Sequence, residues 1–216
     1  MMTPITLNQA VDRVVYQRTL LSVAKALLIA ISGIDGSGKG YITSKMAELL
    51  TQQNLNIATI NIDGWLNLPD QRFSTTQPDK QFYHHAIRFD ALFSQLVLPL
   101  RDRRSIHLKA DYAEETASEY RKHIYQFEDV DVILLEGIYL LKRPFQSYFD
   151  LSFWVECSFE TALKRAIARS QEGLSPAETV AAYQTIYFPA QRIHFEQDQP
   201  QQAATAIIHN DGYGSD

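Results

Sequence analysis

The sequence predicts an α/β domain built on a parallel sheet, and three consecutive stretches of the chain support this fold class. The apolar run at residues 26–31 has the length and composition of a strand that is buried on both faces. The glycine-rich segment 33–40 follows, and residues 41–53 then place apolar side chains along one helical face. A strand, a glycine-rich turn and a helix in this order are typical of a phosphate-binding loop.

The chemistry of the glycine-rich segment explains why it favours phosphate. Its glycines allow the backbone to fold closely around a phosphate group and to direct N–H groups inward, and the start of the following helix adds partial positive charge. Lys39 is expected to reach the outer phosphates as a point charge. The residues expected to bind nucleotide are Gly33, Asp35, Gly36, Ser37, Gly38, Lys39, Gly40 and Tyr41.

One position departs from the usual pattern of such a loop. The residue after the lysine is normally Ser or Thr, whose hydroxyl ligates Mg²⁺, but here it is Gly40. Thr43 and Ser44 lie almost one turn further along the helix, so we do not expect either to replace the missing hydroxyl.

Composition narrows the class of protein. With 216 residues the chain can form one α/β domain with a substantial core, and its formal charge of −5 argues against a general nucleic-acid binder. The single cysteine, Cys157, lies in an apolar run and is expected to be a buried thiol. A chain with one cysteine cannot form an intramolecular disulfide, and neither a signal peptide nor a membrane-spanning run is recognisable. We therefore expect a cytoplasmic protein without membrane association.

A single domain over residues 1–216 is the simplest organisation, since the sequence contains no repeats or linkers. Residues 1–24 should hold one amphipathic outer helix capped by Thr6. Residues from about 158 to 190 should form a lid helix and the helix that follows it, which starts at Ser175.

Two acidic residues are predicted at strand ends. A strand at residues 55–62 leads to Asp63, and a strand at residues 132–135 leads to Glu136. Because the carboxyl ends of parallel strands meet at one edge of the sheet, both carboxylates should lie beside the glycine-rich loop. Asp63 could accept the proton of an attacking hydroxyl or bind Mg²⁺ through water, and Glu136 could bind the same ion. A turn aspartate and an exposed strand-end glutamate are the structural alternatives.

The middle of the chain gives weaker signals. Residues 66–85 are expected to be a long irregular loop, and residues 90–100 a helix capped by Asp90. The charged run at residues 101–104 reads as a solvated turn. Residues 105–112 alternate apolar and polar side chains like a hairpin strand, and they lead to an acidic segment at residues 114–116 that could face a substrate.

The last third of the chain supplies a strand at residues 151–155, a final strand at residues 203–208 and a polar tail that should be frayed from Asn210 onward. In the helix between them, Arg165 and Arg169 lie four residues apart on one face. Two arginines so placed can clamp phosphates as a lid closes, or they can simply form a solvated basic face.

These landmarks together resemble the phosphoribulokinase/uridine kinase family of P-loop kinases over most of the chain, from about residue 28 to residue 211. Their order and spacing make the resemblance specific. The matching segments are the loop Gly33 to Lys39, Ile62-Asp63-Gly64-Trp65, His84-His85-Ala86-Ile87-Arg88-Phe89-Asp90, Leu134-Leu135-Glu136-Gly137-Ile138, Lys164-Arg165 and Tyr187-Phe188-Pro189-Ala190. The resemblance implies a three-layer P-loop NTPase fold, with a five-stranded parallel sheet, helices on both faces and a small lid.

The resemblance also implies an activity, which is transfer of the γ-phosphate of ATP to a substrate hydroxyl with the help of Mg²⁺. Lys39 would steady the outer phosphates, Asp63 would act as the catalytic base, and Glu136 would hold the metal ion together with Asp63. Arg165 and Arg169 would be the lid arginines, with Arg165 taking part in catalysis. The residues implied at the substrate are Asp63, Tyr112 and Arg88.

Two departures from the family pattern leave the acceptor open. Uridine kinases follow a tyrosine with an aromatic-and-histidine motif that holds the nucleoside, whereas Tyr112 is followed here by Ala113-Glu114-Glu115-Thr116-Ala117. A nucleoside acceptor is favoured, while sugar phosphates and pantothenate-like alcohols stay open. Because of Gly40, the alternative is a nucleotide-binding regulatory protein with weak or no kinase activity. A homo-oligomer is compatible with either function.

Overall fold

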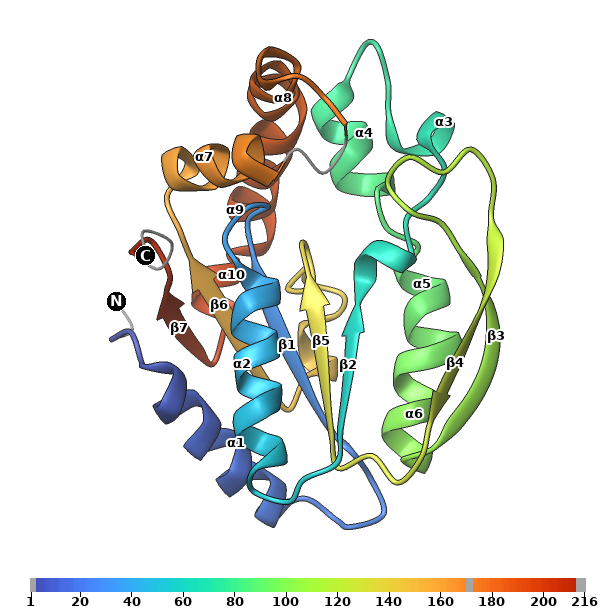
Figure 1. Cartoon of the computed structure of the whole chain (residues 1–216), viewed down its shortest axis with the longest axis vertical. Helices are drawn as coiled ribbons and strands as arrows, with labels where there is room; N and C mark the ends of the chain where they lie inside the picture. The colour runs from blue at the N-terminus through green and yellow to red at the C-terminus, as the bar shows by residue number, and fades with distance from the viewer. Residues whose placement is uncertain (1–2, 170–172, 213–216) are drawn as a thin grey trace.

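A computed structural model describes residues 3–169 and 173–212 of the chain. Its centre is a five-stranded sheet in the order β2-β5-β1-β6-β7, in which every neighbouring pair is parallel (Figure 1). The sheet confirms the predicted α/β class with a parallel sheet. The strands are β1 (Leu27–Gly33), β2 (Ile57–Asn61), β5 (Val132–Gly137), β6 (Leu151–Glu156) and β7 (Ala206–His209).

Helices cover both faces of this sheet, because the central strands are apolar on both sides. All seven residues of β1 are buried, and they alternate between two separate cores. Leu27, Ile29 and Ile31 belong to the core beneath α1 (Leu7–Leu20) and α2 (Lys39–Thr51). Leu28 and Ala30 belong to the larger core on the opposite face. The elements on that side include α4 (Pro78–His85), α5 (Phe89–Ala91), α6 (Leu98–Arg103), α7 (Phe159–Arg169), α8 (Pro176–Ala182) and α9 (Phe188–Asp198).

The predicted helix caps at Thr6 and Ser175 are confirmed. Thr6 forms a reciprocal capping box with Gln9, and Ser175 forms one with Glu178. Ser158 likewise accepts a hydrogen bond from the backbone N–H of Thr161 in the first turn of α7. Residues 170–172, which follow the described part of that helix, lie outside the described residues.

Two prolines lie within long helices that continue past them. A π-helical turn at residues 92–97 precedes Pro99 and joins α5 to α6, and a second at residues 183–187 precedes Pro189 and joins α8 to α9. Proline cannot donate the usual helical hydrogen bond, and the wider turn accommodates this loss. The prediction that Asp90 caps the first of these helices is wrong, because Arg88 is the capping position and Asp90 lies in the first turn.

The segment 66–85 is not the irregular loop that the sequence predicts. It contains α3 (Pro69–Arg72) and α4, and both helices begin with a proline at a position where its missing N–H costs nothing. Phe82 and Tyr83 of α4 are buried against the larger core. Helices of 4 and 8 residues contain too few apolar side chains to reveal a helical periodicity in the sequence.

The basic run at residues 101–104 is the end of α6 and a left-handed residue after it, not a solvated turn. The guanidinium group of Arg101 lies 2.7 Å from the carboxylate of Asp150, and that of Arg104 lies 2.9 Å from Asp131. These carboxylates precede β6 and β5, so the two ion pairs tie the helix end to the amino ends of central strands.

A two-stranded antiparallel hairpin stands apart from the main sheet, on the outer side of α5 and α6 (Figure 1). Its first strand, β3 (Ile106–Tyr112), confirms the predicted hairpin strand. Its partner, β4 (Arg121–Phe127), has a predominantly exposed and polar sequence. The hairpin forms one wall of the site described below.

The end of the described chain is more ordered than the predicted frayed tail. A short helix, α10 (Pro200–Ala203), replaces the first residue of the predicted last strand, which begins at Ala206. Asn210 is buried, and its side-chain amide donates to the carbonyl of Ser37 at 2.7 Å. Residues 213–216 of the predicted tail lie outside the described part of the chain.

Cys157 is buried at the end of β6, as predicted, and burial raises the pKa of its thiol to about 11. In the part of the chain that the structure describes, no helix has both the length and the apolarity that crossing a bilayer requires.

Candidate active site

The glycine-rich loop lies between β1 and α2, where the sequence places it. Gly36 and Gly38 have φ angles of 75° and 84°, which are left-handed values that favour glycine. A Cβ atom on Gly36 would lie 2.6 Å from the carbonyl oxygen of Ala162, and one on Gly38 would lie 2.2 Å from the side-chain nitrogen of Asn210. The loop is therefore wedged against α7 and the end of β7, which fixes its shape before any ligand binds.

Lys39 is the first residue of α2, and its side chain is buried in this loop. Its ammonium group donates to the carbonyl oxygen of Ile34 at 3.0 Å, so it lies across the mouth of the turn. An ammonium group in that place can exchange this carbonyl for a phosphate oxygen.

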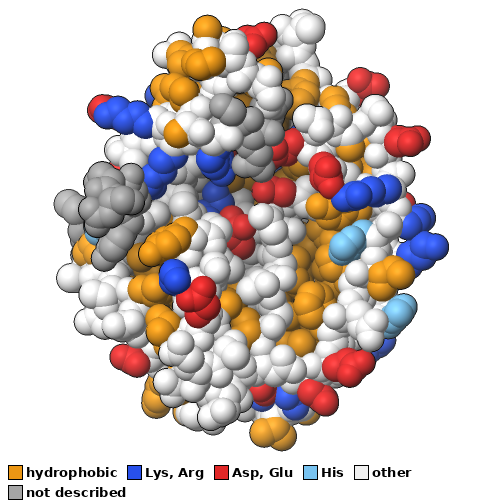
Figure 2. Space-filling model, in the orientation of Figure 1, with side chains coloured by type: hydrophobic (Ala, Val, Ile, Leu, Met, Phe, Trp, Pro, Cys, Tyr) orange, Lys and Arg blue, Asp and Glu red, His pale blue; other side chains and the backbone are white. Residues whose placement is uncertain are grey.

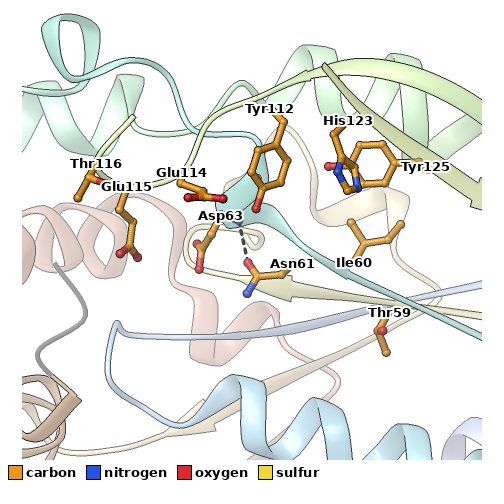
Figure 3. Close-up of a pocket in the computed structure, with 11 residues that line it drawn as sticks. Thr59, Ile60, Asn61, Asp63, Tyr112, Glu114, Glu115, Thr116, His123 and Tyr125 are labelled. Carbon is orange, nitrogen blue, oxygen red and sulfur yellow. Dashed lines mark hydrogen bonds between the residues drawn. The ribbon is translucent and has the colours of Figure 1, made fainter. Parts of the chain in front are cut away.

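Asp63 lies two residues beyond the end of β2, in a 3₁₀ turn at Ile62–Gly64, and not directly at the strand end as predicted. The side-chain oxygen of Asn61 causes this turn by accepting the backbone N–H of Asp63 at 2.7 Å (Figure 3). Gly64 completes it, because a Cβ atom there would lie 2.5 Å from the ring of Tyr112. The turn thus brings Asp63 under the hairpin.

Glu136 lies in β5, between β1 and β2. Its register partners are Ile31 of β1 and Asn61 of β2. Because these three strands are parallel, their carboxyl ends place the loop, Glu136 and the Asp63 turn at one edge of the sheet.

A cavity of about 360 Å³, here called the loop cavity, joins these residues. Lys39, Asp63 and Glu136 all line it, as the strand-end prediction requires. The other lining residues are Asp35, Gly36, Gly38, Gly40, Tyr41, Asn61, Leu66, Arg72, Phe82, Glu115, Ile138, Arg169, Tyr187 and Gln191.

Asp63 and Glu136 hold protons more tightly than they would in water. Burial raises the pKa of Glu136 to about 7; the charge of Lys39 opposes this rise, and the carboxylates of Asp63 and Asp35 add to it. Burial also raises the pKa of Asp63, again against the influence of Lys39. Two crowded carboxylates of this kind favour a cation between them.

A second cavity, of about 540 Å³, lies between the Asp63 turn and the hairpin, and is here called the hairpin cavity. Figure 3 shows the carboxylates of Asp63, Glu114 and Glu115 toward one end and the rings of His123 and Tyr125 at the other. Asp63 lines both cavities, so a group bound in one can meet a group bound in the other at this carboxylate. The remaining lining residues are Thr59, Ile60, Asn61, Gly64, Tyr112 and Thr116.

The two arginines of α7 have different surroundings. Arg169 lines the loop cavity, and its guanidinium group lies 3.6 Å from the carboxylate of Asp35. Arg165 donates to the carbonyl oxygen of Asn210 at 2.7 Å and to that of Ser37 at 3.3 Å. Arg165 therefore braces the loop from outside the cavity, whereas Arg169 borders the cavity itself.

The two further substrate residues implied by the resemblance also differ. Tyr112 lines the hairpin cavity. Arg88 does not line it, because its guanidinium group donates to the carbonyl oxygens of Leu66 at 3.1 Å and Asp111 at 2.7 Å. Its position 4.6 Å from the ring centre of Tyr120 adds a cation–π contact. Arg88 thus holds the Asp63 turn and the hairpin together.

Several lining residues were missed in the sequence. His123 and Tyr125 form the far wall of the hairpin cavity, and the alternation of His123, Tyr125 and Phe127 in β4 was a period-two signal that could have revealed this face. Arg72 and Gln191 reach the loop cavity from helices distant in sequence, and no local pattern marks either one.

The side chains of the loop cavity can supply only some of the oxygen ligands that Mg²⁺ requires. No three Asp, Glu, His or Cys side chains of the described residues converge in a way that could hold a metal ion alone. Glu136 and Asp63 supply oxygen donors, and Thr43 does not replace the missing hydroxyl because its Oγ1 donates to the carbonyl of Lys39 at 2.9 Å. These residues fit an ion held mainly by nucleotide phosphates, with Glu136 and Asp63 completing its coordination.

Comparisons with known proteins agree with this geometry. The model of the phosphoribulokinase/uridine kinase family matches residues 28–184. A protein from Macrococcus caseolyticus described as uridine kinase is 28% identical over 195 residues, which cover 88% of this chain and 90% of that protein.

Solved structures share the fold at low sequence identity. A Bacillus stearothermophilus protein, described as a possible uridine kinase, has a TM-score of 0.68 at 17% identity, with 93% of this chain and 99% of that one covered. D-glycerate 3-kinase from Cryptococcus neoformans has a TM-score of 0.65 at 11% identity, with 97% and 98% covered. At such identities the likeness shows a shared fold alone. The two proteins are described with different phosphate acceptors.

Proposed function

Because the chain belongs to the phosphoribulokinase/uridine kinase family, we propose that it is an ATP-dependent small-molecule kinase that transfers the γ-phosphate to a substrate hydroxyl. A uridine kinase-like reaction with a nucleoside acceptor is favoured by the M. caseolyticus relative. One observation supports the kinase assignment most strongly: Asp63 borders both the loop cavity and the hairpin cavity. A carboxylate so placed can meet the hydroxyl of one bound molecule and the phosphate of another.

In this proposal the loop cavity binds the triphosphate. The N–H groups of the loop and the ammonium group of Lys39 receive the outer phosphates, and Arg169 neutralises charge as they transfer. Bound Mg²⁺ would supply further charge neutralisation at these phosphates, with Glu136 and Asp63 as its protein ligands. Arg165 acts indirectly, by bracing the loop through the carbonyl of Ser37.

The acceptor occupies the hairpin cavity, with its hydroxyl directed at Asp63. The carboxylate orients the hydroxyl and accepts its proton as the new bond to the γ-phosphorus forms, while the bond from that phosphorus to the bridging oxygen breaks and ADP leaves with the electron pair. The Asn61 side chain holds the turn that presents this carboxylate, through the 2.7 Å hydrogen bond to the Asp63 N–H. Tyr112 supports the acceptor from the hairpin side.

The test is the variant Asp63→Asn, assayed for ATP consumption with Mg²⁺ and a panel of hydroxyl acceptors headed by uridine and cytidine. We expect turnover to fall by roughly 10²- to 10⁴-fold while ATP binding, followed by calorimetry, is retained. Asp12→Asn, on the exposed face of α1, is the matched control and should behave as the parent protein. Near-normal turnover of Asp63→Asn would rule out its role as the base.

The relatives reported above are described as kinases, so they give no support to a regulatory protein without kinase activity. ATP binding by the parent protein without phosphoryl transfer to any acceptor of the panel would count against the kinase proposal itself.

A further inference from the structure

We propose that the hairpin cavity accepts only hydroxyl compounds without negative charge, either neutral or cationic, and rejects phosphate esters and carboxylates. This inference rests on the proposed function and narrows its acceptor class. It is based on the acidic side chains that line the cavity and on the contacts that the nearby Arg and Lys side chains already make.

Among the Asp, Glu, Lys and Arg side chains of the described residues, only acidic ones line the hairpin cavity. Asp63, Glu114 and Glu115 line it, and neither lysine nor arginine does (Figure 3). Two of the three carboxylates also approach the nucleotide end, since Asp63 and Glu115 line the loop cavity as well. An anionic group bound at that end would be repelled mainly by Asp63 and Glu115, which are partly buried, because Glu114 is exposed and forms an ion pair with Arg121.

The basic side chains on the hairpin side of this cavity already have partners in its walls. Arg88 donates to the carbonyl oxygens of Leu66 and Asp111. Arg121 forms an ion pair with Glu114 and lies 4.8 Å from the ring centre of Tyr112, and Lys122 lies 2.5 Å from the carboxylate of Asp111. A carboxylate or phosphate on the acceptor would have to displace one of these contacts to find a counter-charge.

The cations able to meet phosphate are concentrated in the other cavity. Lys39, Arg72 and Arg169 all line the loop cavity and none lines the hairpin cavity. Figure 2 shows basic side chains gathered below α7 with acidic ones beside them, and further basic side chains at the outer edge of the hairpin side. Of these two cavities, the described lysine and arginine side chains thus line the loop cavity alone, whereas carboxylates line both.

The rest of the hairpin cavity suits a neutral polar molecule that has a flat face. His123 packs 5.1 Å from Tyr112 and 4.6 Å from Tyr125 between ring centres, which gives a continuous aromatic wall. Asn61, Thr59 and Thr116 offer uncharged hydrogen-bonding groups. The volume of about 540 Å³ is in the range of small-molecule sites.

The experiment uses acceptors that share a reacting hydroxyl and differ in charge. The pairs are 5-aminomethyluridine and 5-carboxymethyluridine around uridine, pantothenol and pantothenate, glycerol and glycerate, and ribulose and ribulose 5-phosphate. Binding is measured by calorimetry on the full chain with Mg²⁺ and a non-hydrolysable ATP analogue, and turnover is measured with ATP. We expect every pair that binds to favour its neutral or cationic member by at least tenfold, with a smaller ratio at high salt.

Two variants test whether the acidic residues of the hairpin cavity cause the preference for neutral or cationic acceptors. Replacing both acids in Glu114→Gln/Glu115→Gln should reduce the discrimination against the anionic members by at least threefold. The control is Glu119→Gln, an exposed position of the same hairpin loop that does not line the cavity, and it should leave the ratio unchanged.

Each outcome has a distinct meaning. Equal or better binding of the anionic members would overturn the charge inference and leave the kinase proposal intact. Selective binding of neutral members without phosphoryl transfer would overturn the kinase proposal and support the charge inference. If no member of either class binds in the presence of nucleotide, both are wrong.

Discussion

The side chain of Ile62 fills the space that a side chain on Gly137 would occupy. A Cβ atom on Gly137 would lie 2.2 Å from both Cδ1 and Cγ1 of Ile62. Ile62 immediately precedes Asp63, and Gly137 immediately follows Glu136, so this contact helps to set the separation of the Asp63 and Glu136 carboxylates.

Gly137→Ala should therefore impair the site as well as the fold. The added methyl group forces Ile62 to move, which we expect to lower the free energy of unfolding by about 1–3 kcal/mol. Because Asp63 moves with Ile62, turnover should also fall several-fold at a temperature where the variant is folded. Urea denaturation and steady-state kinetics measure the two effects. Gly212→Ala, where a Cβ atom meets no other atom within 4 Å, is the control.

A hydroxyl can be restored at position 40 without disturbing the loop. No atom lies within 4 Å of a Cβ atom built on Gly40, which lines the loop cavity beside Lys39. We expect Gly40→Ser to lower the Mg²⁺ concentration needed for half-maximal activity by roughly threefold or more, because it adds an oxygen ligand. Gly40→Ala distinguishes the effect of the oxygen ligand from stabilisation of the helix, because alanine adds a Cβ atom without a hydroxyl. An equal response of the two variants would show that no ligand position was open.

The raised pKa of Glu136 makes its carboxyl group a cost to stability at neutral and higher pH. From its ordinary value of 4.5 up to about 7, the unfolded chain has lost this proton while the folded chain retains it. Stability from this group is thus present at low pH and is lost as the pH rises through about 7. Glu136→Gln should match the parent protein near pH 4 and exceed its free energy of unfolding by roughly 1–3 kcal/mol at pH 8, without metal or nucleotide. Urea melts across this range measure the difference, which the exposed substitution Glu119→Gln should not produce. A difference independent of pH would contradict the assigned titration.

The two arginines of α7 should respond differently to replacement. Arg169→Ala removes a cation from the loop cavity, so we expect turnover to fall at least tenfold with little change in thermal stability. Arg165→Ala removes hydrogen bonds to the carbonyls of Ser37 and Asn210, so we expect a lower melting temperature and weaker ATP binding. The Lys variants sharpen the comparison, because Arg169→Lys keeps the charge whereas Arg165→Lys cannot make both hydrogen bonds. A reversal of the two patterns would assign the phosphate contact to Arg165.

The parallel sheet was predictable because its central strands are buried on both faces and are therefore continuous apolar runs in the sequence. Residues 26–31 and 132–135 are apolar on both faces, as a covered parallel strand must be. Strand β4 was not predictable in the same way, because most of its residues are exposed and its partner β3 precedes it across an irregular loop. Short helices such as α3 offer too few residues for a periodic signal.

The site was predictable where a local motif creates the geometry and unpredictable where tertiary packing does. Lys39, Asp63 and Glu136 follow from strand ends and a glycine-rich turn, and the structure gathers them in one cavity. The separate surroundings of Arg165 and Arg169 depend on where α7 meets Asp35 and Asn210, which lie more than 40 residues from either arginine. The same limit applies to Arg88, whose carbonyl partners belong to two other segments.

The empty surroundings of Gly40 have an evolutionary consequence. A glycine codon can become a serine codon by a single base change. Nothing in the neighbouring packing would select against serine at position 40. Lineages carrying this fold could therefore gain or discard the hydroxyl repeatedly and adjust their dependence on divalent ions without any compensating substitution elsewhere.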